Sequence, residues 1–124
     1  MDKPLKLLVI DDNRELLAAI YQFLSNKKYD VVSASDGLDG LKLLEAEEQR
    51  FDLVITDIVM PNISGLAIIS IVKKKFPGTP VIAITGWGEH PEMLALEAQA
   101  DLVLEKPFEL DELDDAIKEL LSRK

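Results

Sequence analysis

The feature of this sequence that most constrains its fold is an alternation, repeated five times, between a short apolar run and a longer segment with helical spacing. The first run, Leu5 to Ile10, is apolar apart from Lys6 and leads directly into two aspartates. The segment 13–26 then places apolar side chains three and four positions apart, as on one face of a helix. The alternation predicts strands at about 5–10, 29–34, 51–56, 80–84 and 102–104, and helices at about 13–26, 36–48, 66–76, 91–98 and 110–122.

Strands that are apolar along their whole length and alternate with helices are typical of a parallel sheet covered on both faces. Right-handed crossovers between such strands produce a doubly wound α/β fold. We therefore predict one domain over residues 1–124, with a five-stranded parallel sheet and five helices on its two faces. By analogy, the strand order that best suits five such units is the flavodoxin-like order 2-1-3-4-5.

The composition excludes several classes of function. The chain has no cysteine, which excludes disulfides and thiolate chemistry, and its single histidine excludes a histidine-rich zinc site. The formal net charge of −9 argues against direct binding to nucleic acid or to an anionic membrane. The first residues lack the layout of a signal peptide, and no apolar run approaches the roughly 18 residues of a membrane span. We expect a small, cytoplasmic protein with no membrane insertion.

Polar side chains stand just past the ends of four predicted strands. Asp11 and Asp12 follow the first strand and Asp57 follows the third. Thr85 follows the fourth strand and Lys106 follows the fifth. Ligands of doubly wound sheets bind beyond the carboxyl ends of the strands, where the strand order reverses, which in this order lies between strands one and three. The sequence therefore predicts a ligand site with three carboxylates, one hydroxyl and one ammonium.

This set of groups indicates a particular chemistry. Three neighbouring carboxylates cannot all stay ionised without a countercharge, so either one takes up a proton or a cation lies among them. An all-oxygen ligand set favours Mg²⁺, Mn²⁺ or Ca²⁺ over zinc, and a site with few carboxylates suits Mg²⁺, which also binds phosphate oxygens. A lysine and a threonine hydroxyl are suited to stabilising a phosphoryl group, and a carboxylate is able to accept one.

The sequence resembles the receiver domains of bacterial two-component response regulators, the CheY-like family. Each matching stretch is weakly specific alone, but all of them in this order and spacing are highly specific. The matching stretches are Val-Ile-Asp-Asp-Asn at 9–13, the run from Asp52 to Pro61 with Gly65, Ile-Ala-Ile-Thr-Gly at 82–86, and Lys-Pro-Phe at 106–108.

The resemblance implies a role for each acidic residue. Asp57 would accept a phosphoryl group from a sensor histidine kinase or a phosphotransfer protein. Asp12 would bind Mg²⁺ directly, Asp11 would act mostly through a water, and Asp57 with the main-chain carbonyl of Val59 would complete the protein ligands. The domain would catalyse only its own phosphorylation and dephosphorylation, so it would not be an enzyme in the usual sense.

The resemblance also implies roles for the other polar groups. Thr85 would donate a hydrogen bond to a phosphoryl oxygen, and Lys106 would pair with the phosphoryl group. The Lys106–Pro107 peptide would be cis, as is typical of the family. Phosphorylation would change a surface that binds a downstream target protein or an output domain fused to the receiver.

Three positions depart from the family pattern. The family usually has an aromatic residue three positions before the lysine, where this chain has Val103, so the usual coupling of the threonine to a swinging aromatic ring is in doubt. Val59 and Trp87 occupy the positions that usually tune hydrolysis of the phosphoryl group, and both are apolar. We therefore expect the phosphoryl group to persist on this chain longer than is usual in the family.

Simpler structural roles remain open for single residues. Asp12 or Asn13 would also cap the first helix, and Asp57 would also suit a loop after a buried strand. Thr85 is equally suited to a turn, and Lys106 to an ordinary surface position. Complementary polar groups at four strand ends nevertheless favour a site.

Two other functions also remain open. A phosphatase of the haloacid-dehalogenase type uses an aspartate nucleophile, Mg²⁺ and a lysine, but its nucleophile lies in an Asp-x-Asp pattern after the first strand. This chain has Asp-Asp-Asn at 11–13 and no cap insertion. A scaffold that only binds partners is disfavoured because all the polar side chains of the expected site are present.

Overall fold

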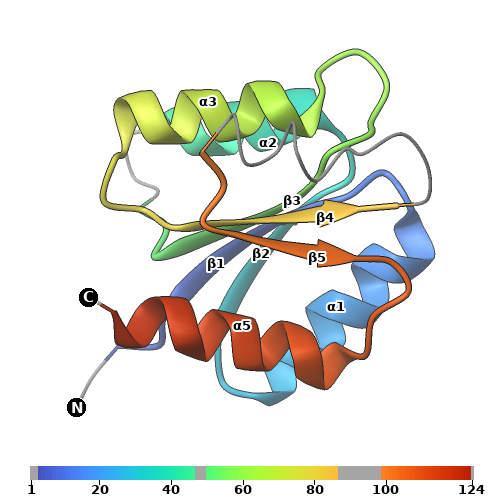
Figure 1. Ribbon diagram of the computed structural model, residues 1–124, viewed down its shortest axis with the longest axis vertical. Coiled ribbons are helices and arrows are strands. Elements are labelled where there is room, and N and C mark those ends of the chain that lie inside the picture. Colours follow the sequence, from blue (N-terminus) through green and yellow to red (C-terminus); the bar gives the residue numbers. More distant parts are fainter. Residues whose placement is uncertain (1–2, 47–49, 87–98, 124) are drawn as a thin grey trace.

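A five-stranded parallel sheet forms the centre of the computed structural model, which describes residues 3–46, 50–86 and 99–123 (Figure 1). The strand order is β2-β1-β3-β4-β5, which confirms the predicted order. The strands are β1 (Lys6–Ile10), β2 (Asp30–Ala34), β3 (Leu53–Asp57), β4 (Val81–Thr85) and β5 (Leu102–Glu105).

Helices cover both faces of the sheet, with α1 and α5 on one face and α2 and α3 on the other (Figure 1). The described residues contain four helices rather than five, because the helix predicted over 91–98 lies outside them. None of these helices is long and apolar enough to cross a membrane. The helices are α1 (Arg14–Asn26), α2 (Gly37–Glu45), α3 (Gly65–Lys75) and α5 (Leu110–Ser122).

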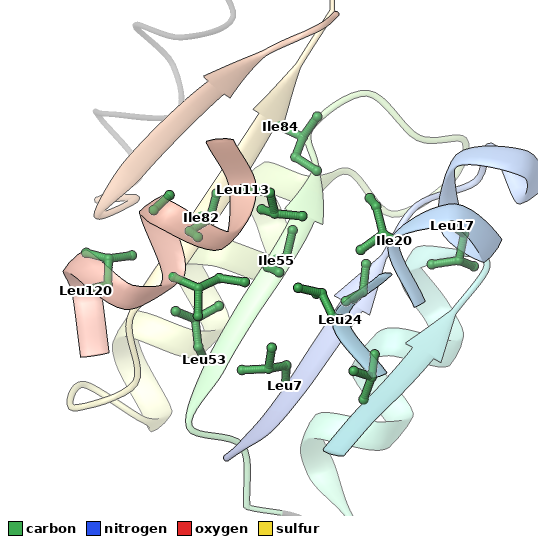
Figure 2. Close-up of a cluster of buried hydrophobic side chains, with 14 residues drawn as sticks. Leu7, Leu17, Ile20, Leu24, Leu53, Ile55, Ile82, Ile84, Leu113 and Leu120 are labelled. Atoms are coloured by element: carbon green, nitrogen blue, oxygen red, sulfur yellow. The ribbon is translucent and has the colours of Figure 1, made fainter. Parts of the chain in front are cut away.

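Burial on both faces explains why the strands are apolar throughout. In β1, Leu7 and Val9 belong to the cluster under α1 and α5, whereas Leu8 and Ile10 belong to the cluster under α2 and α3. Figure 2 shows the first of these clusters, in which side chains of the central strands meet those of both helices. Because the two clusters share one backbone, a residue at the end of a central strand is held from both sides.

The last three strands end one residue later than predicted, whereas β1 and β2 end at the predicted residues. Asp57 and Thr85 were expected just past strands three and four, but they are the last residues of β3 and β4. Asp57 stands opposite Ile84 in the ladder, and Thr85 stands opposite Glu105. Pairing with a neighbouring strand, which local sequence does not reveal, extends both strands to these polar residues.

Capping side chains define where the helices begin. The Asn13 side chain accepts a hydrogen bond from the Leu16 N–H at 3.1 Å, so Asn13 caps α1. The sequence left open whether Asp12 or Asn13 caps this helix, and the hydrogen bond assigns the cap to Asn13. Ser64 caps α3 by accepting a hydrogen bond from the Ala67 N–H at 3.3 Å.

Candidate functional site

The structure brings acidic side chains together at the edge where the strands end, which we call the carboxyl edge (residues 11–13, 57–59, 85–86 and 106). One carboxylate oxygen from each of Asp11, Asp12 and Asp57 lies within 4.8 Å of the others. Asp11 and Asp57 are buried, with exposed fractions of 0% and 5%, whereas Asp12 is exposed. The strand order reverses between β1 and β3, where the sequence predicted the site.

Lys106 supplies the positive charge of this group. Its ammonium lies 3.3 Å from Asp57 Oδ2 and 3.7 Å from Asp11 Oδ2. Its main-chain N–H donates a hydrogen bond to the carbonyl of Thr85 at 2.7 Å, which ties the residue after β5 to the end of β4. The Lys106–Pro107 peptide is cis, as the resemblance implies.

Burial raises the pKa of both buried carboxyl groups. For Asp57, the neighbouring charge of Asp11 raises the pKa further, and the Lys106 ammonium only partly opposes these effects. For Asp11, burial again raises the pKa, while a hydrogen bond of 2.8 Å from the Asn13 N–H and the charge of Lys106 oppose it. A single ammonium therefore does not compensate the buried carboxylates, and a bound cation would.

Two buried polar atoms at this edge have no hydrogen-bond partner in the described part of the chain. They are Asp11 Oδ2 and Thr85 Oγ1. A buried polar atom without a partner costs about 1–3 kcal/mol, so such atoms are rare unless a ligand or water satisfies them. The carboxylate oxygen without a partner belongs to the cluster of Asp11, Asp12 and Asp57, which we call the acidic trio, and it fits a hard cation. The orphaned hydroxyl is free to donate to an incoming oxygen.

Comparisons with known proteins decide the family. A sequence profile of the response regulator receiver domain matches residues 7–118. The chain belongs to the response regulator receiver domain family. It is therefore a receiver of the kind that serves two-component phosphorelay signalling.

Individual relatives agree with this assignment. The receiver is 36% identical over 122 residues to the transcriptional regulatory protein GlrR of Escherichia coli, covering 98% of this chain and 27% of GlrR. A response regulator receiver domain from Clostridium thermocellum superimposes with a TM-score of 0.88 at 35% identity, covering 96% of this chain and 95% of the other. TrrA from Thermotoga maritima, solved in complex with Mg²⁺-BeF, gives a TM-score of 0.83 at 32% identity, covering 94% and 98%.

The curated relatives are longer proteins. This chain spans about a quarter to a half of the length of those it matches. Several of them are named as transcriptional regulators. What those whole proteins do is therefore a separate matter from what the receiver does.

Two of the three positions that depart from the family pattern lie within the described residues. Val103, in β5, is partly buried and packs against the apolar cluster under α2 and α3. Val59 is 69% exposed, next to the acidic trio in sequence but outside the core. Trp87 lies outside the described residues.

Two residues beside Asp57 escaped the sequence-based selection of site residues. Thr56 is fully buried, and its hydroxyl donates a hydrogen bond to the Asp57 carbonyl at 3.0 Å. Gly65 approaches the same carbonyl so closely that an added Cβ would lie 1.9 Å from the oxygen. A hydroxyl in an otherwise apolar strand was the signal for Thr56, but threonine is common in strands for other reasons.

Proposed function

We propose that Asp57 is the residue of this receiver that accepts a phosphoryl group, in a reaction that requires Mg²⁺. The observation that carries the proposal is the placement of its carboxylate. It lies within 4.8 Å of the carboxylates of Asp11 and Asp12, and 3.3 Å from the Lys106 ammonium. The Mg²⁺-BeF complex of the related TrrA supports the same chemistry.

The acidic trio and the Val59 carbonyl would hold the metal ion. When bound, Mg²⁺ supplies positive charge to the carboxylates and to the phosphoryl oxygens. Asp11 Oδ2, which accepts no hydrogen bond from a described residue, and the raised pKa values of Asp11 and Asp57 support this proposal. Both features mark buried negative charge that Lys106 offsets only in part.

Asp57, Lys106 and Thr85 have different roles in the phosphoryl transfer. A carboxylate oxygen of Asp57 attacks the phosphorus atom, an O–P bond forms, and the P–N bond of the donor phosphohistidine breaks with its electron pair staying on the imidazole nitrogen. The Lys106 ammonium offsets the charge of the transferred oxygens. The Thr85 hydroxyl, buried and without a described partner, donates to one of them. Water later attacks the same phosphorus, the O–P bond to Asp57 breaks, and inorganic phosphate leaves while the Asp57 carboxylate is restored. The receiver therefore acts only on itself.

The partners follow from this reaction. We propose that a sensor histidine kinase or a phosphotransfer protein donates the phosphoryl group. A downstream target protein, or an output domain fused to the receiver in a longer protein, would read the result. The names of the relatives as transcriptional regulators support an output of that kind. The net charge of −9 supports a receiver that does not itself bind nucleic acid. A cytoplasmic location and a receiver domain over all of residues 1–124 belong to the same proposal.

Intact mass spectrometry tests the proposal directly. The protein is incubated with acetyl phosphate and Mg²⁺, and peptide mapping then locates any added phosphoryl group. We expect one group on Asp57 in the wild type, none there in Asp57→Asn, and none without Mg²⁺. Asp30→Asn, at an exposed position where β2 begins, is the matched control and should react as the wild type does. Steady release of phosphate without an adduct would indicate a phosphatase, and no reaction would indicate a scaffold.

A further inference from the structure

Thr56 is a polar residue in an apolar part of the sheet. In the strand ladder it stands between Ile10 of β1 and Ala83 of β4, and it is fully buried. A buried hydroxyl is costly unless it forms a hydrogen bond. Its Oγ1 donates one, of 3.0 Å, to the main-chain carbonyl of Asp57. The hydroxyl is therefore hydrogen-bonded to the backbone of Asp57, the residue that carries the proposed chemistry.

The neighbouring main-chain atoms are held as well. The Ile58 N–H donates a hydrogen bond of 3.0 Å to the Ile84 carbonyl, and the Ile58 carbonyl accepts one of 2.9 Å from the Gly65 N–H. Gly65 also packs against the Asp57 carbonyl, where an added Cβ would lie 1.9 Å from the oxygen. These hydrogen bonds and this packing contact hold both peptide planes between Asp57 and Val59.

These two peptides connect two of the proposed metal ligands, the Asp57 carboxylate and the Val59 carbonyl. We propose that Thr56 is a positioning residue, whose hydroxyl sets the plane of the Asp57–Ile58 peptide and thereby the direction in which both ligands face Mg²⁺. This inference rests on the proposed function of the site. It adds a residue that touches neither metal nor phosphoryl group and acts only through the backbone of Asp57.

The preferences of Mg²⁺ explain why such a constraint matters. The ion demands near-ideal octahedral geometry with ligands at about 2.0–2.1 Å, so a tilted peptide plane weakens binding more than it would for a larger ion. Removing a group that orients a metal ligand typically costs about 10–100-fold in affinity or activity. We expect the lower end of this range, because the Gly65 contacts remain when the hydroxyl is removed.

The experiment compares three variants with the wild type. Thr56→Val removes the hydroxyl and keeps the shape, and Thr56→Ser keeps the hydroxyl. The matched control is Thr79→Val, because the Thr79 hydroxyl also donates to a backbone carbonyl, that of Phe51 at 3.5 Å. Thr79 lies at the opposite edge of the sheet, where the strands begin, which we call the amino edge (residues 5–6, 51–53, 79–81 and 101–102). Calorimetry measures the Kd for Mg²⁺, acetyl phosphate measures the phosphorylation rate, and thermal unfolding measures Tm.

We expect Thr56→Val to bind Mg²⁺ about 10-fold more weakly and to be phosphorylated about 10-fold more slowly. In Thr56→Ser, the Kd for Mg²⁺ and the phosphorylation rate should stay within about twofold of the wild-type values. Thr79→Val should lower Tm and leave both quantities unchanged. The carbonyl ¹³C resonance of Asp57 should move in the valine variant and not in the serine variant, because only the valine removes the hydrogen bond.

Other results would overturn the inference. Wild-type behaviour of Thr56→Val would show that the hydroxyl has no part in positioning. A defect in Thr56→Ser as large as that in Thr56→Val would show that the effect does not depend on the hydroxyl, because serine keeps it. If Thr56→Val does not unfold cooperatively, Thr56→Ala replaces it in the same comparison. A wild type that neither binds Mg²⁺ nor accepts a phosphoryl group would overturn the proposed function itself.

Discussion

The two edges of the sheet use the same kinds of side chain with opposite results. At the amino edge, Asp52 accepts a hydrogen bond from the Lys6 N–H at 2.7 Å. Asp101 accepts one from the Val81 N–H at 2.7 Å and forms an ion pair with Lys73. These aspartates satisfy the first N–H groups of the strands, and their polarity serves the fold.

At the carboxyl edge, similar residues are left partly unsatisfied. Asp11 Oδ2 and Thr85 Oγ1 are buried and have no hydrogen-bond partner within the described ranges. Burial raises the pKa of Asp11 and Asp57 in spite of the nearby Lys106. The comparison teaches that the presence of aspartate, lysine and threonine does not mark a site, whereas polar atoms that the fold does not satisfy do.

The largest effect is expected from replacing Gly65, which packs against the Asp57 carbonyl. In Gly65→Ala, the new Cβ would lie 1.9 Å from the Asp57 carbonyl oxygen, which is backbone and cannot move away cheaply. We expect the free energy of unfolding to fall by about 3 kcal/mol, together with a loss of phosphorylation. Urea unfolding measures the first effect and acetyl phosphate labelling the second.

Gly78→Ala is the control at the turn that leads into the amino edge. An added Cβ there meets nothing within 4 Å, so stability should change by no more than about 0.5 kcal/mol. Equal losses in the two alanine variants would contradict the expectation that the close approach of Gly65 to the Asp57 carbonyl causes the loss.

The same Asp→Asn substitution should have opposite signs at the two edges. Asp57→Asn removes a buried charge that its surroundings disfavour, so without metal it should stabilise the protein by about 1 kcal/mol. Asp101→Asn removes the ion pair with Lys73 and should destabilise the protein by about 1 kcal/mol. Mg²⁺ should raise the Tm of the Asp101 variant but not that of the Asp57 variant. Shifts of the same sign would remove the distinction between the edges.

The pH dependence of stability should reveal the carboxyl edge when no metal is present. The folded state holds the protons of Asp11 and Asp57 to a higher pH than the unfolded state, because their pKa values lie above the ordinary 3.8. Their contribution to stability is therefore complete below pH 3.8 and is lost as the pH rises through the raised pKa values.

Urea unfolding in EDTA over a pH series measures this fall. Added Mg²⁺ should reduce it, because the ion stabilises the ionised carboxylates. Asp57→Asn should show a shallower fall than the wild type. A free energy of unfolding that rises with pH in EDTA by the same amount in both proteins would contradict the prediction.

The smallest effect is expected at Tyr29, which links the start of β2 to α5. Its hydroxyl donates a hydrogen bond to Asp114 Oδ1 at 3.0 Å, and burial together with Asp114 raises the pKa of Tyr29 to about 12. The contribution of this group to stability is complete below the ordinary value of 10 and is lost as the pH rises through about 12.

Tyr29→Phe should therefore lower stability by about 0.5–1 kcal/mol at neutral pH and leave Mg²⁺ binding unchanged. Spectroscopic titration of the phenol, compared with the same titration of Tyr29→Phe, checks the pKa of Tyr29. A change in the Kd for Mg²⁺ would show that this contact is coupled to the carboxyl edge.

Much of the fold could be predicted because its main determinants are local. Residues such as Leu7 to Ile10 are apolar on both faces of a strand, and that pattern requires helices on both sides. The ends of elements were less predictable. The strands reach Asp57 and Thr85 because partners in the ladder lie beside them, and α2 ends at Glu45 rather than near 48.

The residues that lie at the carboxyl edge were predictable, but their contacts were not. Asp11, Asp12, Asp57, Thr85 and Lys106 follow from parallel strands whose ends meet at one edge. The sequence left Asp12 and Asn13 both open as the cap of α1, and the hydrogen bond from the Leu16 N–H assigns it to Asn13. Thr56 was missed because the partner of its hydroxyl, a carbonyl, is present at every residue and leaves no trace in the sequence.

The alternation of strands and helices, the parallel sheet and the residues at the strand ends all follow from the order of residues along the chain. Only the tertiary structure decided which polar atoms are buried without partners, how close Lys106 lies to Asp57, and that Thr56 and Gly65 meet at one carbonyl oxygen. The physical reason is range. Periodicity and propensity act over a few residues, whereas burial, pKa shifts and close packing depend on groups that are distant in the chain and become neighbours only when it folds.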